Sequence, residues 1–180
     1  MQEESKQGLI HLYYGDGKGK TTAALGLAIR AWGQGLTILI LQFIKGKWKY
    51  GELKALEKFS PQIEIRALGE GFTRRDEDEK RQQEHKKAAL AGWEQAVFEI
   101  QNGSWDMVIL DEINYAVDFG LIDFAAVLQL VENKPENMHL VLTGRNAREE
   151  LLERADLVTE MKEIRHPYQQ GIKAQPGIEF

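Results

Sequence analysis

A glycine-rich segment near the start of the chain contains residue types that bind phosphate. The segment from Gly15 to Thr22 reads Gly-Asp-Gly-Lys-Gly-Lys-Thr-Thr. Its glycines allow a tight turn in which backbone N–H groups point at phosphate oxygens. Lys20 can reach the same phosphates, and the Thr21 hydroxyl can coordinate Mg²⁺. Because the segment follows a β-rich run and opens a helical pattern, we interpret it as the phosphate loop of an ATP site rather than as a glycine-rich turn without a ligand.

This loop is one residue shorter than the usual phosphate loop. The usual spacing places four residues between the first glycine and the Gly-Lys pair. Counting back from Gly19 puts Tyr14 where the first glycine should be, and Gly15 leaves only three residues in between. Because a shorter loop cannot wrap the β-phosphate in the usual way, the sequence predicts an unusual pose for the nucleotide.

Two acidic residues later in the chain could complete a metal site. Asp111 and Glu112 follow the apolar run from Met107 to Leu110. In an open α/β sheet, ligands bind at the carboxyl ends of the strands, so both carboxylates should lie near the phosphate loop. An acidic residue at this place holds Mg²⁺ in P-loop proteins. The alternative is that the pair only caps the helix that follows.

Strand and helix patterns alternate along the chain. The strands expected from β-rich runs are Leu9 to Tyr14, Leu36 to Phe43, Ile63 to Leu68, Met107 to Leu110, His139 to Thr143 and Leu157 to Ile164. The expected helices are Lys20 to Trp32, Leu53 to Phe59, Glu79 to Ile100, Phe124 to Glu132 and Ala147 to Ala155. Parallel neighbours need crossover connections, so the alternation predicts an α/β fold. With the phosphate loop, we expect a P-loop (RecA-like) three-layer sandwich with a mainly parallel central sheet, in one domain covering residues 1–180.

The composition limits the partners of the chain. Its formal net charge of -5 and pI near 5.5 argue against a protein that coats nucleic acid or an anionic membrane. The first residues have the character of neither a signal peptide nor a transit peptide, and the apolar run from Leu36 to Phe43 is too short to span a bilayer. There is no cysteine, and the histidines are widely spaced. We therefore expect a cytoplasmic protein that binds no nucleic acid, no membrane and no zinc.

The sequence resembles the ATP:corrinoid adenosyltransferases from about Gly8 to Phe180. The shared motifs are G-D-G-K-G-K-T-T-A-A-L-G from Gly15, Q-F-I-K-G from Gln42, G-F-T from Gly71, I-L-D-E-I from Ile109, L-T-G-R from Leu142, A-D-L-V-T-E from Ala155, and H-P-Y-Q-Q-G-I-K-A-Q-P-G-I-E-F from His166. The short phosphate loop is itself a mark of that family. The resemblance implies a homodimer that binds ATP in the reverse of its common orientation, with the γ-phosphate deep in the loop.

The resemblance also implies a reaction and the residues that serve it. A cobalt(I) corrinoid attacks the C5′ carbon of ATP and expels inorganic triphosphate, in adenosylcobalamin biosynthesis or salvage. Cobalt(I) is already a strong nucleophile, so the protein needs to align the reactants and clamp the leaving group, and Lys20 contributes through its charge. The expected ATP-binding residues are Gly15, Asp16, Gly17, Lys18, Gly19, Lys20, Thr21, Thr22 and Arg145. The expected ligands of Mg²⁺, or of Mn²⁺, are Thr21, Glu112 and Asp111.

For the corrinoid, the resemblance points to Phe72, Arg74 and Lys45. In the family, the phenylalanine lies against the lower face of the corrin and keeps the cobalt four-coordinate and reducible. Arg74 stands where the best-known members have tryptophan, which suggests a different corrinoid face or a different form of the substrate. Lys45 follows a strand on the same sheet edge and could add charge to the site or contact the corrinoid. A flavoprotein reductase that supplies cobalt(I) is a further implied partner.

Two other functions remain open from the sequence. In a small-molecule kinase or ATPase, Glu112 would orient a nucleophile towards the γ-phosphate. In a nucleotide-gated binding protein, ATP would control the delivery of a ligand without chemistry. The products formed from Mg²⁺-ATP and a reduced corrinoid distinguish these functions, because only the transferase yields triphosphate and an adenosylated corrinoid.

Overall fold

The computed structural model describes residues 7–46, 51–69, 71, 79–102 and 104–179. Within these residues, six strands form one sheet in the order β3-β2-β4-β5-β1-β6, and every pair of neighbours is parallel. The strands are β1 (Ile10–Tyr14), β2 (Ile38–Gln42), β3 (Ile63–Ala67), β4 (Met107–Asp111), β5 (His139–Thr143) and β6 (Leu157–Glu160). The predicted parallel sheet is therefore confirmed.

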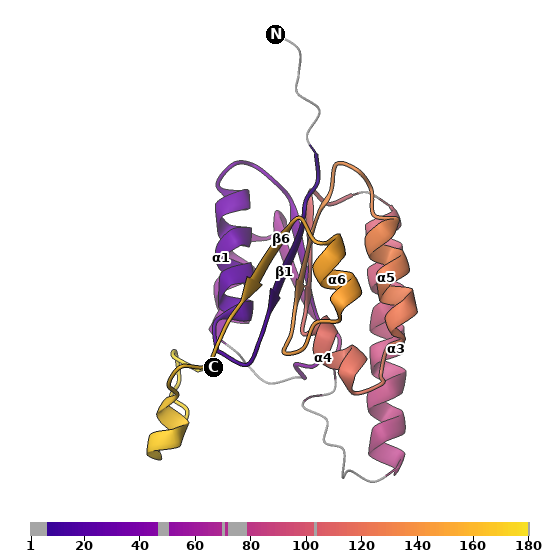
Figure 1. Ribbon diagram of the computed structural model, residues 1–180. Coiled ribbons are helices and arrows are strands. Elements are labelled where there is room, and N and C mark those ends of the chain that lie inside the picture. Colours follow the sequence, from indigo (N-terminus) through magenta and orange to yellow (C-terminus); the bar gives the residue numbers. More distant parts are fainter. Residues whose placement is uncertain (1–6, 47–50, 70, 72–78, 103, 180) are drawn as a thin grey trace.

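Helices cover both faces of this sheet (Figure 1). They are α1 (Lys20–Trp32), α2 (Gly51–Leu56), α3 (Glu79–Gln101), α4 (Ile113–Asp118), α5 (Phe124–Glu132) and α6 (Glu149–Arg154). The buried alanines of α1 and Leu56 of α2 pack against one face, while residues of α3, α5 and α6 pack against the other. The result is the three-layer α/β sandwich that the sequence predicts.

The middle of the sheet forms the core. All five residues of β2 and all five of β4 are buried, because each strand has neighbours on both sides and helices on both faces. This burial explains why the first four residues of each strand are all apolar instead of alternating with polar residues. By contrast, β6 is an edge strand whose four residues are all exposed. None of the described helices is long and apolar enough to cross a membrane.

Several predicted bounds shift by one or two residues, and three larger differences concern elements near the site. The last strand ends at Glu160 rather than at Ile164, because the chain leaves the sheet there and crosses the phosphate loop. The helix α4 has no counterpart among the predicted helices and begins directly after Glu112. The predicted helix from Leu53 to Phe59 is divided into α2 and a 3₁₀ turn, Glu57–Phe59.

The strand order also decides which residues meet. Because β5 lies between β1 and β4, the phosphate loop after β1 and the acids after β4 are not on adjacent strands. The last residue of β5, Thr143, therefore lies between them, in register with Tyr13 of β1. On the other side of β4, Gln42 is in register with Asp111. These strand ends form one polar edge.

Candidate functional site

The phosphate loop runs from the end of β1 to the start of α1. Gly15 and Gly19 have φ angles of 109° and 112°, a backbone conformation that favours glycine. The Gly15 N–H donates to the Arg145 carbonyl oxygen over 2.7 Å, and the Gly17 N–H donates to the Met161 carbonyl oxygen over 2.7 Å. Two segments from elsewhere in the sequence therefore fix the backbone of this short loop.

Lys20 occupies the inside of the loop. Its ammonium donates to the carbonyl oxygens of Gly15 and Gly17, each over 2.7 Å. Burial lowers the pKa of Lys20, while the nearby charge of Glu112 acts in the opposite direction. The ammonium thus lies at the centre of the loop, close to the first turn of α1, where an anionic phosphate would be attracted by both.

The first turn of α1 supplies further donors. N–H groups at the start of an α-helix have no carbonyl partner within that helix. In α1 these groups belong to Lys20, Thr21 and Thr22, and they follow directly on the loop. Together with the positive end of the helix dipole they are the groups that could bind the anion expected at this place.

Asp111 joins this turn to the strand ends. Its carboxylate is 1% exposed and accepts three hydrogen bonds from three different elements. The hydroxyls of Thr21 and Thr143 each donate to Oδ1 over 2.8 Å, and the Gln42 amide donates to Oδ2 over 3.0 Å. A buried carboxylate is costly unless it is hydrogen-bonded, and these donors meet that requirement. The network holds α1, β2, β4 and β5 in one fixed arrangement.

Glu112 adopts a left-handed backbone conformation, with φ 62°. Its N–H donates to the Thr143 hydroxyl oxygen over 2.9 Å, which holds this unusual conformation in place. Burial raises the pKa of the Glu112 carboxyl, and the charge of Asp111 raises it further, while Lys20 lowers it. A non-glycine residue keeps this costly conformation only where the surrounding structure stabilises it. Such residues cluster at functional sites.

Two more cations lie at the same edge of the sheet. The ammonium of Lys45 is 2.7 Å from a carboxylate oxygen of Glu52 and 3.7 Å from Asp111 Oδ2. Its side chain is only 13% exposed, so it belongs to the polar edge and not to the open surface. Arg145 is exposed, and its Nε lies 3.2 Å from a carboxylate oxygen of Asp16.

The structure brings together most of the residues that the sequence predicts for the site. Those that it places at the carboxyl edge of the sheet are Gly15, Asp16, Gly17, Lys18, Gly19, Lys20, Thr21, Thr22, Lys45, Asp111, Glu112 and Arg145. Phe72 and Arg74, predicted to contact the corrinoid, lie outside the described residues.

The sequence analysis did not identify three individual residues that form hydrogen bonds at this edge: Gln42, Glu52 and Thr143. Gln42 and Thr143 each end a buried strand with a polar side chain, as Asp111 does, and that shared pattern could have identified them. Glu52 lies on α2 after a segment without any strand signal, and no feature of its sequence context distinguishes it.

The oxygen atoms at this edge suit a hard divalent cation. Mg²⁺ is usually bound by one or two carboxylates together with phosphate oxygens of the substrate. The Thr21 hydroxyl, the Asp111 carboxylate and the Glu112 carboxyl provide such donors, and the hydrogen bond between Thr21 and Asp111 shows that two of them converge. The donor set therefore fits the metal that the sequence predicts.

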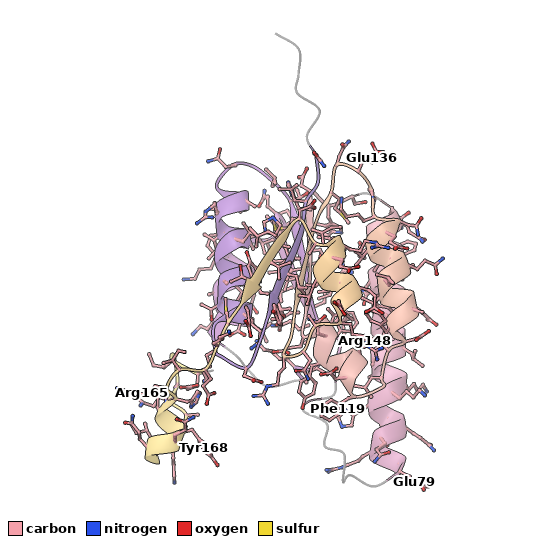
Figure 2. All side chains as sticks on the ribbon, in the orientation of Figure 1. Glu79, Phe119, Glu136, Arg148, Arg165 and Tyr168 are labelled. Carbon is pink, nitrogen blue, oxygen red and sulfur yellow. The ribbon has the colours of Figure 1, made fainter. Side chains whose placement is uncertain are left out.

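A cavity of about 650 Å³ lies at the opposite edge of the sheet. Glu136 is among its lining residues, and Figure 2 shows Glu136 at the upper edge of the domain while Phe119, just after α4, lies at the lower edge. Two further lining residues, Arg154 and Glu132, form an ion pair with each other over 3.0 Å. The cavity is thus separate from the phosphate loop.

Comparisons with known proteins point to one family. The family described as "ATP:corrinoid adenosyltransferase BtuR/CobO/CobP" matches residues 6–180. A corrinoid adenosyltransferase from a Sinorhizobium species is 46% identical over 179 residues, which cover 97% of this chain and 81% of that protein. A corrinoid adenosyltransferase from Escherichia coli K12 is 36% identical over 179 residues, which cover 99% of this chain and 89% of that protein.

Among solved structures, a KaiC-like protein from Pyrococcus horikoshii superposes with a TM-score of 0.51 at 15% identity. The superposition covers 87% of this chain and 73% of that protein. At this level of identity the likeness concerns the fold alone.

Proposed function

This chain belongs to the ATP:corrinoid adenosyltransferase family, and from that premise we propose that it transfers the 5′-deoxyadenosyl group of ATP to the cobalt(I) of a corrinoid and releases inorganic triphosphate. The observation that carries the proposal is the hydrogen-bonded network of Thr21, Asp111 and Thr143, which fixes the acidic strand end against the phosphate loop. That arrangement suits a site whose task is to hold a triphosphate and its metal.

In the proposed reaction, a cobalt(I) electron pair forms the bond to C5′ of ATP. The bond between C5′ and the triphosphate oxygen breaks, and its electron pair leaves with the triphosphate. The cobalt is formally oxidised by two electrons and the C5′ carbon is formally reduced by the same two, so the step needs no external oxidant. No proton has to be removed. Negative charge develops on the leaving triphosphate, and stabilising that charge is the protein's main electrostatic contribution.

The residues of the phosphate loop would provide this stabilisation. Lys20 lies inside the loop, next to the N–H groups at the start of α1. The hydrogen bonds of Lys20 to the loop and the helical backbone hold these groups in place, so they would require little reorganisation during the reaction. When bound, Mg²⁺ or Mn²⁺ would neutralise part of the triphosphate charge, with Thr21 and Glu112 as ligands and Asp111 in support. Clamping the triphosphate also fixes the position of C5′ for attack.

We propose the remaining properties on the same premise. The protein acts as a single-domain homodimer in the cytoplasm, and a flavoprotein reductase supplies cobalt(I). The substrate is cob(I)yrinic acid a,c-diamide or cob(I)alamin, in the biosynthesis or salvage of adenosylcobalamin. Phe72 and Arg74 contact the corrinoid, and Arg145 contributes charge to the nucleotide site.

One experiment tests the proposed reaction against the two alternatives. The protein is incubated with Mg²⁺-ATP and a chemically reduced corrinoid, and the products are separated by chromatography. We expect equal amounts of triphosphate and adenosylated corrinoid, and much less of both from the Lys20→Ala variant at the same ATP concentration. Formation of ADP and phosphate would indicate a kinase or ATPase, and ATP binding without any product would indicate a binding protein.

A further inference from the structure

The chain crosses the phosphate loop after it leaves the sheet. We call the segment Met161–Glu179 the strap. The Met161 N–H donates to the Tyr14 carbonyl oxygen over 2.7 Å, and the Met161 carbonyl oxygen accepts from the Gly17 N–H over 2.7 Å. A single residue of the strap therefore bonds to the last residue of β1 and to the middle of the loop.

The contact leaves no room for side chains on two loop glycines. A Cβ atom at Gly15 would lie 2.4 Å from the Met161 carbonyl oxygen. A Cβ atom at Gly17 would lie 2.7 Å from the carbonyl carbon of Lys162. Both neighbours are backbone atoms, which cannot move aside as the end of a side chain can. The strap itself thus requires glycine at these positions, in addition to any requirement of the phosphates.

The far end of the strap returns to the same loop. Glu179 forms an ion pair with Lys18, and its side chain is 14% exposed although the Lys18 side chain is 55% exposed. Between these two anchors, every residue of the strap except the partly buried His166 is exposed. Arg165 and Tyr168 lie well away from the three layers of the domain (Figure 2), and 79% of Tyr168 is accessible.

The bonding partners of the loop's polar groups suggest what the strap does. The N–H groups of Gly15 and Gly17 are bonded to Arg145 and Met161, and Lys20 bonds to the loop carbonyls from inside. Lys18 is held by Glu179 instead of pointing into the loop with Lys20. The strap therefore holds the loop at the Gly17 backbone and at the Lys18 side chain, directly before the start of α1.

We propose that the strap braces the phosphate loop and that Glu179 is a positioning residue, acting through Lys18, for binding of the triphosphate. This inference rests on the proposed binding of ATP at the loop and adds a second segment to that site. Fixing a loop in its binding conformation improves affinity, because less conformational freedom is lost on binding. Because such coupling is reciprocal, bound triphosphate must in turn stabilise the strap in its contact with the loop.

The first test measures nucleotide affinity in the full-length chain. Glu179→Gln keeps the shape of the side chain but removes the charge that holds Lys18. We expect the dissociation constants for ATP and for inorganic triphosphate to rise about two- to fivefold, the range for one partly exposed ion pair. Glu179→Asp should restore part of the loss. The rate of adenosylation at saturating ATP should be unchanged, which separates positioning from catalysis.

Glu163→Gln is the matched control. It removes the same charge from the same strap, but Glu163 is exposed and accepts its hydrogen bond from Gln169 within the strap. This variant should bind ATP as the unaltered protein does. Equal losses of ATP affinity in both variants would mean that only the overall charge of the strap matters. Tighter ATP binding by Glu179→Gln would mean that Glu179 competes with phosphate. Either result overturns the proposal.

The second test uses limited trypsin digestion. Arg165 and Lys173 are exposed residues of the strap and provide cleavage sites. We expect ATP or inorganic triphosphate to slow cleavage at these sites several-fold in the unaltered protein and in Glu163→Gln, but not in Glu179→Gln. If ATP binds and cleavage is unaffected in the unaltered protein, the strap is not coupled to the site. If ATP does not bind at all, the proposed function itself fails.

Discussion

The Thr21 hydroxyl donates a 2.8 Å hydrogen bond to Asp111 Oδ1, although the two residues are 90 positions apart in the sequence. The same carboxylate oxygen accepts from Thr143, so one atom joins the start of α1 to the ends of β4 and β5. The phosphate loop and the acidic pair thus form one hydrogen-bonded unit. Preorganisation of this kind reduces the reorganisation needed when charge develops in the transition state.

Replacing Thr143 by valine should remove the hydrogen bonds that join the end of β5 to Asp111 and Glu112. The change removes a donor to Asp111 and the acceptor of the Glu112 N–H, while keeping the shape of the side chain. We expect the free energy of unfolding to fall by about 1–3 kcal/mol, because buried polar groups lose their partners. Denaturant titration measures this loss. Thr159→Val, on the exposed strand β6, is the control and should change stability by no more than about 0.5 kcal/mol.

Lys20→Ala tests the centre of the phosphate loop. The ammonium of Lys20 is the cation inside the loop, so we expect ATP affinity to fall about 10- to 100-fold, the range for lost charge-assisted hydrogen bonds. The circular dichroism spectrum should remain that of the folded protein. The control Lys58→Ala removes an exposed lysine from the 3₁₀ turn after α2. Unchanged ATP affinity in Lys20→Ala would show that the nucleotide binds elsewhere.

The raised pKa of Glu112 predicts how metal binding varies with pH. The ionised carboxylate is the form that binds Mg²⁺, so the Mg²⁺ requirement for ATP binding should increase as the pH falls through the raised pKa. Glu112→Gln should bind Mg²⁺-ATP weakly and without this pH dependence, because a neutral amide is a poorer ligand for a hard cation. Calorimetric titration at a series of pH values measures both effects. A wild-type Mg²⁺ response in the variant would remove Glu112 from the ligand set.

The same pKa shift predicts an effect on stability in the absence of nucleotide. A carboxyl whose pKa is raised on folding favours the folded state below its ordinary pKa of 4.5 and loses that contribution as the pH rises through the raised value. The Glu112→Gln variant should therefore be more stable than the wild type at neutral pH. The difference should disappear below pH 4.5. Thermal melting across this range tests the sign.

Gly144→Ala should be strongly destabilising because two constraints act at this position. Gly144 has a φ angle of 147°, and an added Cβ would lie 2.6 Å from the Cβ of the buried residue Asn114. We expect a loss of at least about 2 kcal/mol. Gly26→Ala, in the exposed part of α1 with nothing within 4 Å of the added Cβ, should instead stabilise the protein by about 0.5–1 kcal/mol. Denaturant titration of both variants distinguishes local clash from a general effect of removing glycine.

The periodic parts of this fold are predictable from the sequence. The helix Lys20–Trp32 and the strand His139–Thr143 match their predicted bounds, because their hydrophobic periods and flanking turn residues agree. The strand that should run to Ile164 stops at Glu160 because its continuation bonds to the phosphate loop, which is a tertiary contact that no local pattern encodes. The six-residue helix α4 was missed because only Glu112 separates it from β4, so no loop residues mark its start.

In the candidate site, too, local sequence patterns predict some residues, while tertiary contacts determine the roles of others. That the loop and the acids lie together was predictable because their residue types and spacing are typical of a P-loop protein, and the Thr21–Asp111 hydrogen bond joins them. The roles of Thr143 and Gln42 depend on strand order, since each is positioned by its place beside Asp111 in the sheet. Strand order is set by packing over the whole domain, so a local reading of the sequence does not give it.

Lys45 provides the last prediction, because the sequence leaves open whether it contacts the corrinoid or adds charge to the nucleotide site. In the structure, its ammonium lies between Glu52 and Asp111, and Asp111 in turn bonds Thr21 at the phosphate loop. This position favours a role in balancing charge around the metal and the triphosphate.

Lys45→Met should therefore weaken Mg²⁺-ATP binding about tenfold, the size expected for one charge-assisted contact. The KM for the corrinoid, measured at saturating ATP, should be unchanged. Glu52→Gln keeps the lysine and removes its partner, so it should leave the corrinoid KM unchanged and affect Mg²⁺-ATP binding less than Lys45→Met does. A raised corrinoid KM with unchanged ATP affinity in Lys45→Met would instead assign this lysine to the corrinoid.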